Sequence, residues 1–208
     1  MYKLYWAKSM GSMVAEVLFK EIGVEYEKVP IDMEKEENRS PEFLAINPLG
    51  QIPTLVLPDG TVMTESAAMV LQITDRHPEA KLAPPAGSPE GARFQRWLLF
   101  MATTIYPAEQ RLFYADRITT DASAVAGIEA CARTDMDSYF AILNDALDPG
   151  PYLLGESFSA VDVYLWMFVK WHPDTAKLFA DNPRIARLVE LVEARPSVAK
   201  VWAENRDD

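Results

Sequence analysis

Apolar residues in the first eighty positions alternate between the spacing of strands and the spacing of helices. A short apolar strand is predicted at 4–6, and apolar side chains then recur with helical period over 13–22, where Gly23 provides a stop. The pattern at 26–31 indicates a second strand. Strand, helix and strand in this order predict a parallel βαβ unit.

A hairpin is predicted further along the same segment. Ser40 and Pro41 suit the N-cap and first position of a short helix. Strands at 54–57 and 61–63 then flank the turn sequence Pro58-Asp59-Gly60. A right-handed crossover followed by a hairpin gives a mixed four-stranded sheet flanked by helices, which is a thioredoxin-like layout.

The pattern after the hairpin is helical only. Residues 81–91 are rich in proline and glycine and read as a linker. The segment 161–171 is apolar nearly all round, which predicts a buried central helix, and Ser159 and Asp162 before it form a capping-box pattern with no catalytic role. We therefore predict an α/β thioredoxin-like domain at 1–80, the linker at 81–91 and an all-α domain at 92–208.

Composition and charge exclude several classes of protein. The chain has 208 residues and is 49% hydrophobic, with a net charge of −11 and no basic run, so a nucleic-acid or anionic-membrane surface is not expected. No apolar stretch approaches the roughly 20 residues that a bilayer span needs, and we expect a cytoplasmic protein. The single cysteine, Cys131, excludes an internal disulfide. His77 and His172 each precede a proline near a predicted helix end, which favours capping, and no metal site is predicted.

Two short motifs suit the capture of a small anionic peptide. Proline cannot donate to a sheet ladder, so the backbone at Ile52 and Pro53 can offer an N–H and a C=O to an extended ligand. Glu65 and Ser66 open a helix, where free N–H groups and the helix dipole favour a carboxylate. An ordinary helix start explains the second motif equally well when it is taken alone.

Together with the thioredoxin-like layout, the linker and the helical domain, these motifs resemble a soluble glutathione S-transferase, specifically a serine-type, bacterial-like member. The resemblance covers almost the whole chain. It implies that Pro53 is cis, that Ile52 pairs with the cysteinyl part of glutathione, and that Glu65 and Ser66 hold the γ-glutamyl end.

Two polar residues are candidates for the glycine carboxylate of glutathione, namely Gln51 and Arg39. Both could equally be solvated surface residues.

The family's thiol-activating residue lies in the loop 7–13. Ser9 is favoured because its position five residues before Val14 matches the serine-type spacing, whereas Ser12 lies where an N-cap is expected and Tyr5 corresponds to the tyrosine-type classes. Lowering a thiol pKa by about two units requires roughly 2.7 kcal/mol. A hydrogen bond to a charged partner supplies about 1.5–3 kcal/mol and a helix N-terminus about 0.3–1, so a hydroxyl suffices.

The resemblance implies an enzyme of detoxification that adds the glutathione thiolate to small electrophiles and works as a homodimer. Met10, Tyr106 and Tyr114 are candidates for a second-substrate pocket, although most aromatic residues of the helical domain are expected in its core. Glutathione is the co-substrate. Glutathione-dependent isomerisation, dehalogenation or peroxide reduction, and a non-catalytic binding role on the same fold, remain open at this point.

Overall fold

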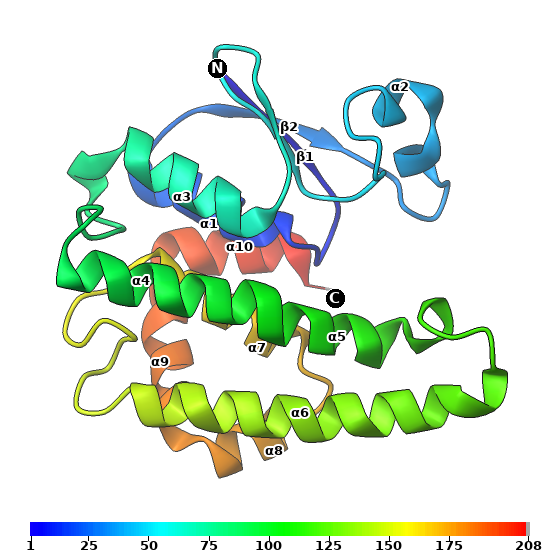
Figure 1. The fold of residues 1–208 in the computed structure, drawn as a ribbon. Helices are drawn as coiled ribbons and strands as arrows, with labels where there is room; N and C mark the ends of the chain where they lie inside the picture. Colours follow the sequence, from blue (N-terminus) through cyan, green and yellow to red (C-terminus); the bar gives the residue numbers. More distant parts are fainter. Residues whose placement is uncertain (207–208) are drawn as a thin grey trace. The chain divides into compact units, whose positions relative to one another are not determined.

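The computed structural model describes residues 1–206 and divides the chain into two compact units (Figure 1). The first unit comprises residues 1–83 and 193–206, and the second comprises Pro84–Val192. The predicted domain 92–208 therefore differs from the structure at its end. The C-terminal helix belongs to the first unit because it packs on the first helix of the chain.

The first unit is built on a mixed four-stranded sheet in the order β2-β1-β3-β4, which confirms the predicted thioredoxin-like fold. Strand β1 pairs parallel with β2 and antiparallel with β3, and β3 pairs antiparallel with β4. The strands are β1 Tyr2–Trp6, β2 Tyr26–Pro30, β3 Thr54–Val56 and β4 Val62–Met63.

Helix α1 lies at the centre of the helical layer of this unit, where it packs against α3 and against α10 (Figure 1). It ends as predicted at Gly23, whose positive φ of 78° suits a residue without a side chain. The α-helices are α1 Ser12–Ile22, α2 Pro41–Leu44, α3 Ser66–Arg76 and α10 Pro196–Asn205, and 3₁₀ turns lie at Glu37–Arg39 and Pro78–Ala80. The core between sheet and helices contains Leu4, Val14, Leu18, Leu55, Met69 and Ile73.

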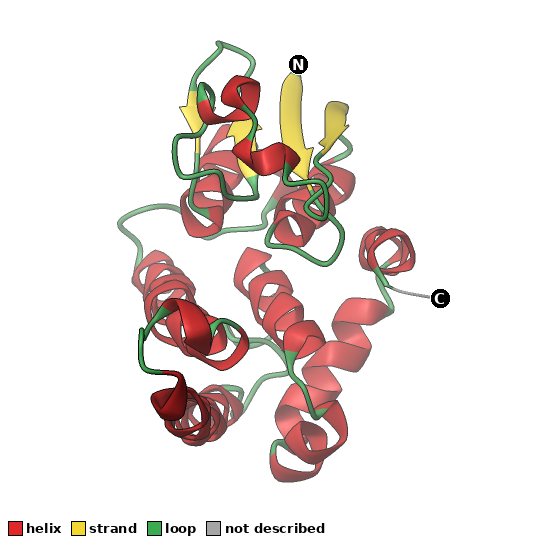
Figure 2. Ribbon diagram, turned by 90° about the vertical axis from the view of Figure 1, so that its right-hand side faces the viewer, coloured by secondary structure: helices red, strands yellow, loops and turns green. Residues whose placement is uncertain are grey.

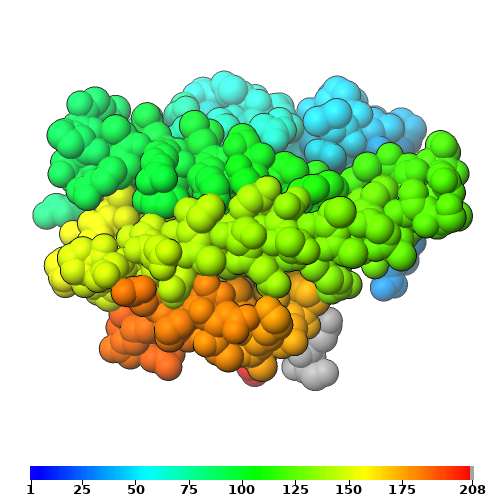
Figure 3. All heavy atoms as spheres, turned by 60° about the horizontal axis from the view of Figure 1, so that its bottom comes forward, coloured from blue at the N-terminus to red at the C-terminus, as the bar shows by residue number. Residues whose placement is uncertain are grey.

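The second unit consists of helices, shown in red in Figure 2. The face in Figure 3 is crossed by the yellow-green spheres of α6, whose other side is buried. The helices are α4 Pro89–Phe100, α5 Tyr106–Phe113, α6 Val125–Ala146, α7 Ala160–Trp171, α8 Thr175–Asp181 and α9 Pro183–Glu193; a π-helical turn occupies Met101–Ile105, and 3₁₀ turns lie at Ala115–Arg117 and Ala122–Ala124.

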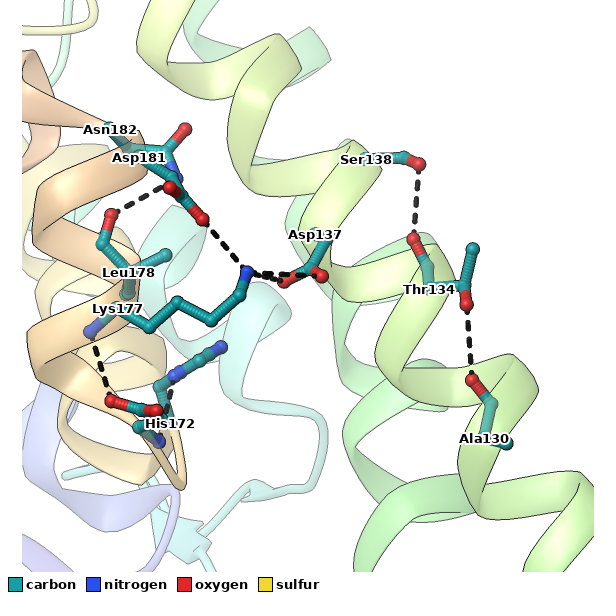
Figure 4. Close-up of polar contacts among 10 residues, drawn as sticks. Ala130, Thr134, Asp137, Ser138, His172, Lys177, Leu178, Asp181 and Asn182 are labelled. Carbon is teal, nitrogen blue, oxygen red and sulfur yellow. Dashed lines mark hydrogen bonds and ion pairs between the residues drawn. The ribbon is translucent and has the colours of Figure 1, made fainter.

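An ion-pair cluster joins α8 to α6 on this surface. The Nζ atom of Lys177 lies 3.3 Å from a carboxylate oxygen of Asp137 on α6 and 2.8 Å from one of Asp181 on its own helix (Figure 4). These side chains are about half exposed, so each pair contributes roughly 0–1 kcal/mol. The apolar packing of α6 and not this cluster therefore holds the unit together.

Pro107 lies within a continuous helical stretch. The π-helical turn Met101–Ile105 runs directly into α5, which contains Pro107 in its first turn. Proline lacks an N–H and its ring collides with the carbonyl four residues earlier. An extra residue in the preceding turn moves that carbonyl away, so the chain stays helical.

The central helix α7 is buried from Ala160 to Val169, as the sequence predicts. The Asp162 side chain is inaccessible to solvent and accepts hydrogen bonds from the Leu153 N–H at 2.8 Å, the Ser159 N–H at 2.8 Å and the Ser159 hydroxyl at 3.0 Å. Burial raises the pKa of Asp162 to about 7, and these hydrogen bonds oppose the rise. The predicted capping box is present and also fixes the preceding loop.

We expect Asp162→Ala to lower the free energy of unfolding by about 2–4 kcal/mol, because it removes the helix cap and leaves the Leu153 N–H buried without a partner. Asp162→Asn keeps one acceptor oxygen and should lose less. Urea denaturation of both variants checks this. An Ala variant within about 0.5 kcal/mol of the wild type would contradict the assignment.

Glu109 is a carboxyl group in an apolar position of α5. Its side chain is 3% exposed and lies on the same helix face as the buried Ile105 and Leu112, and neither carboxyl oxygen has a hydrogen-bond partner among the described residues. Burial raises the pKa of Glu109 from 4.5 to about 8. The folded protein therefore binds a proton that the unfolded chain releases at neutral pH.

We expect stability to fall with rising pH between about 4.5 and 8, since the unfolded chain binds fewer protons there, by up to about 1.4 kcal/mol per pH unit. Glu109→Gln keeps the shape without the titration. The difference in unfolding free energy between wild type and Glu109→Gln, measured with urea across this range, should grow with pH. Parallel pH profiles of the two proteins would refute an unpaired buried acid.

Candidate functional site

The backbone before β3 has the conformation that the resemblance implies. The Ile52–Pro53 peptide bond is cis, Pro53 is buried and the side chain of Gln51 is exposed. The ladder with β1 begins at Thr54, which pairs with Tyr5, so Ile52 lies just beyond the paired strand. Its backbone is therefore placed at the end of the sheet, where an extended ligand can continue the pairing.

Asn47 fixes the shape of this loop and is a residue whose role the sequence analysis missed. It is 1% exposed, and its amide donates to the Gln51 carbonyl at 2.9 Å and to the Thr54 hydroxyl at 3.0 Å. Its Oδ1 accepts from the Leu49 N–H at 3.1 Å. Asparagine before proline is a common turn residue, and the sequence pattern therefore gave no sign of these longer contacts.

Gly50 packs this loop against the segment before α2. Its φ is +62°, and a Cβ atom there would lie 2.7 Å from the Asn38 carbonyl oxygen, so both conformation and space require glycine. The amide of Asn38 donates to the Gly50 carbonyl at 2.8 Å, and the Arg39 guanidinium donates to the Leu49 carbonyl at 3.2 Å. Arg39 is thus held beside the loop 47–53.

The start of α3 has an unusual backbone. Glu65 precedes the helix with φ 63° and ψ 104°, a region that residues other than glycine rarely adopt, and its exposed side chain makes no capping hydrogen bond. Ser66 is the first helical residue and is 7% exposed. An ordinary helix start would use the side chain before the helix as its cap, so this geometry favours the ligand-binding interpretation.

The two motifs lie next to each other because of the β3–β4 register. Leu55 pairs with Met63 and Val56 with Val62. Continuing this antiparallel register by two residues places Pro53 opposite Glu65. The end of β3 and the start of α3 therefore form one local site.

The loop between β1 and α1 holds the two candidate serines. Ser9 has a positive φ of 55°; its N–H donates to Oδ1 of Asn205 at 3.0 Å and its hydroxyl donates to the Asn205 carbonyl at 2.5 Å. Ser12 is fully buried and donates to the Ala7 carbonyl at 3.3 Å. The N-cap of α1 is Gly11, and Ser12 is the first helical residue, which differs by one position from the sequence expectation.

An open pocket of about 410 Å³ lies beside this loop, at the carboxyl ends of the parallel strands β1 and β2. Such ends are the usual place for ligands in sheets of this kind. Its lining residues were not predicted as ligands from the sequence. They are Trp6, Ala7, Lys8, Pro30, Ile31, Asp32 and Glu37.

Comparisons with known proteins agree with this geometry. The family model for the glutathione S-transferase N-terminal domain matches residues 1–73, and the model for the C-terminal domain matches residues 109–206. The chain belongs to the glutathione S-transferase family. The uncharacterized glutathione S-transferase-like protein YncG of Escherichia coli K12 is 32% identical, with 99% of this chain and 98% of that protein covered.

Named enzymes and solved structures are similar over nearly the whole family fold. Glutathione S-transferase GstA of Escherichia coli O157:H7 is 26% identical over 94% of each chain. A glutathione transferase homologue from Sulfitobacter, solved with bound glutathione, is 28% identical over 98% of each chain with a TM-score of 0.88. A sphingomonad glutathione S-transferase, solved in complex with glutathione, is 26% identical over 98% of each chain with a TM-score of 0.83.

The remaining candidate residues of this family member lie in different settings. Tyr5 is half-buried with its ring edge-to-face on Phe43 at 5.5 Å, and Met10 is half-buried in the β1–α1 loop. Tyr106 is half-buried in an aromatic cluster of the second unit. Its ring lies 5.5 Å from the rings of Phe168 and Trp171.

Tyr114 lies at the end of α5 and is 38% exposed. The Arg117 guanidinium covers its ring at 4.2 Å. Its exposure suits a contact with a ligand better than a place in the core.

Neither a metal centre nor a membrane-spanning helix emerges from residues 1–206. No group of three or more His, Cys, Asp or Glu side chains in this range could hold a metal ion. No helix in the same range is long and apolar enough to cross a bilayer. His77 and His172 lie at the C-cap positions of α3 and α7, which confirms that each is at a helix end.

Proposed function

We propose that this chain binds glutathione and adds its thiolate to small electrophiles in the cytoplasm. The observation that supports this best is the β3–β4 register, which brings the cis Ile52–Pro53 backbone opposite the uncapped, left-handed Glu65. One end of the sheet thereby offers backbone pairing next to a helix N-terminus. A short peptide with a carboxylate at one end fits this combination.

Each part of glutathione has a candidate partner. The Ile52 backbone pairs with the cysteinyl residue, the Glu65 carboxylate takes the γ-glutamyl ammonium, and Ser66 with the α3 N-terminus takes the γ-glutamyl carboxylate. The exposed Gln51 and the Arg39 guanidinium, 3.2 Å from the Leu49 carbonyl, are candidates for the glycine carboxylate. These groups position the peptide and leave its thiol to the β1–α1 loop.

Ser9 is the proposed thiol-activating residue. A serine hydroxyl has one proton, and Ser9 donates it to the Asn205 carbonyl, while the fully buried Ser12 donates to the Ala7 carbonyl. Ser9 is partly exposed, so its hydroxyl can turn from that carbonyl to a ligand, whereas Ser12 has no route to solvent. Exposure thus supports Ser9 over Ser12.

The chemical step needs a thiolate and a positioned electrophile. The thiol proton leaves to solvent, and the Ser9 hydroxyl and the N-terminus of α1 stabilise the negative sulfur. The sulfur electron pair then forms the carbon–sulfur bond, and in a substitution the leaving group departs with the electrons of its own bond. Met10, Tyr106 and Tyr114 are the proposed contacts of the electrophile.

We expect Ser9→Ala to raise the pKa of the bound thiol by one to two units, a loss of about 1.4–2.7 kcal/mol, with little change in glutathione affinity. The pH profile of conjugation to a chromogenic aryl halide measures this. Ser12→Ala and Tyr5→Phe are the matched controls and should leave the profile unchanged. A raised pKa in either control, with an unchanged pKa in Ser9→Ala, would move the role to that control residue.

We expect Glu65→Gln and Ser66→Ala to weaken glutathione binding by about 1.5–3 kcal/mol each, because a charged group of the ligand loses its partner. Titration calorimetry measures the affinity. The control is Ser88→Ala, which removes the hydroxyl that accepts from the Gly91 N–H at the start of α4. This control should reduce stability without changing glutathione affinity, and wild-type affinity in both site variants would reject the binding role.

We also propose that the working unit is a homodimer, as the family resemblance implies. Four apolar residues of α4 and the turn that follows it are buried within the chain itself, namely Phe94, Trp97, Leu98 and Met101. Exposed apolar side chains elsewhere on the helical unit are candidates for a partner-facing surface. These are Leu99, Phe113, Ile118 and Ile142, each 44–52% exposed.

Light scattering at micromolar concentration should report about twice the chain mass of 23.4 kDa, because a symmetric dimer is the commonest soluble assembly. Introducing a charge with Leu99→Glu should shift the mass toward the monomer if that surface is shared. A monomeric wild-type protein with full conjugating activity would exclude the dimer as the required unit.

A further inference from the structure

Asn205, the last residue of α10, is a polar side chain with no solvent exposure. Its amide nitrogen donates to the Val201 carbonyl at 2.9 Å and lies 3.5 Å from Oε1 of Glu16. Both of these neighbours are acceptors, so the NH₂ group must face them. The Oδ1 atom is left pointing to the Ser9 N–H, from which it accepts a hydrogen bond at 3.0 Å.

A cluster of charged side chains from α1, β2 and α10 lies next to Asn205 and holds it in place. The Glu16 carboxylate on α1 is fully buried and lies 2.5 Å from Nζ of Lys28 on β2. Lys28 also pairs with Glu204 of α10 at 2.9 Å and covers the Trp6 ring at 3.7 Å. The end of α10 is therefore tied to the sheet and to α1 at the point where it meets the β1–α1 loop.

Ser9 needs such support because of its backbone. Its φ of +55° is a conformation that residues with a side chain adopt only when surrounding contacts impose it. Asn205 contacts both polar groups of Ser9: its Oδ1 accepts from the N–H, and its main-chain carbonyl accepts from the hydroxyl. Only the second of these bonds must break when the hydroxyl turns toward a ligand.

We propose that Asn205 is a positioning residue for thiol activation, whose side chain keeps the Ser9 backbone in place while the Ser9 hydroxyl turns from the Asn205 carbonyl to the glutathione sulfur. This rests on the proposed function of Ser9. Loss of the side chain removes the anchor, and the main-chain carbonyl still competes with the sulfur for the hydroxyl proton. The thiol of bound glutathione should then ionise less readily.

The test is Asn205→Ala, with the ultraviolet absorbance of the glutathione thiolate titrated against pH in the binary complex. We expect the thiol pKa to rise by about one unit, a tenfold smaller ionisation constant, with a much smaller change in glutathione affinity. The control is Asn182→Ala. Asn182 directly follows α8, and its amide makes the same kind of bond to the carbonyl four residues earlier, at 3.1 Å, but it lies in the helical unit (Figure 4).

A double-mutant cycle separates positioning from a general structural effect. In a Ser9→Ala background, Asn205→Ala should add no further rise in the thiol pKa, because the group that it positions is already gone. An unchanged pKa in folded Asn205→Ala, or a full additional shift in the Ser9→Ala background, would overturn the proposal. A wild-type thiol pKa in Ser9→Ala would also overturn the proposal, because Ser9 would then not activate the thiol. The proposed binding of glutathione would be unaffected by that result.

A second variant covers the case in which Asn205→Ala does not fold. In Asn205→Ser the hydroxyl can still donate to the Val201 carbonyl four residues earlier, but the shorter side chain no longer reaches the Ser9 N–H. Folded Asn205→Ser should show the same rise in the thiol pKa as Asn205→Ala, and a wild-type thiol pKa in it would count against the anchor. Absence of any thiolate signal in the wild-type protein would instead reject the proposed function together with this inference.

Discussion

The pairing of β3 with β4 is the constraint on which the proposed peptide site depends. Leu55 lies opposite Met63, and this fixes which residue before β3 meets which residue after β4. A slip by one residue would turn every side chain of β4 to the other face and separate Pro53 from Glu65. The short turn at Pro58-Asp59-Gly60 fixes the register, and a slip would turn the half-buried Met63 away from the face of the buried Leu55.

A second constraint comes from the far end of the chain. Helix α10 packs on α1, and the Arg195 guanidinium makes two hydrogen bonds to the Glu21 carboxylate, at 2.8 and 2.6 Å. These bonds hold the pKa of Glu21 below its ordinary value, although burial opposes them. The same helix then ends at Asn205, against the loop that holds Ser9. Packing that stabilises the first unit therefore also determines the conformation of the proposed catalytic loop.

Patterns of short range were enough to predict most of the fold. The stop of α1 at Gly23, the hairpin around Pro58-Asp59-Gly60 and the capping box at Ser159 and Asp162 each depend on neighbouring residues only, and all three are present. Pro107 was different. Its effect depended on a π-helical turn before it, and no residue pattern at 101–105 indicates that turn.

In the candidate site, too, features that depend on adjacent residues could be predicted, and a contact between residues far apart in the sequence could not. The motifs at Ile52-Pro53 and Glu65-Ser66 could be found because each uses a property of its own residues, namely the missing N–H of proline and the free N–H groups of a helix start. The anchor of Ser9 could not be found in this way, since Asn205 is 196 positions away and looks like an ordinary residue near a helix end. The contact between Asn205 and Ser9 forms only in the folded chain, where α10 packs on α1. Because the NH₂ group of the buried Asn205 amide donates to two acceptors, its Oδ1 atom must face the β1–α1 loop, where it accepts from the Ser9 N–H.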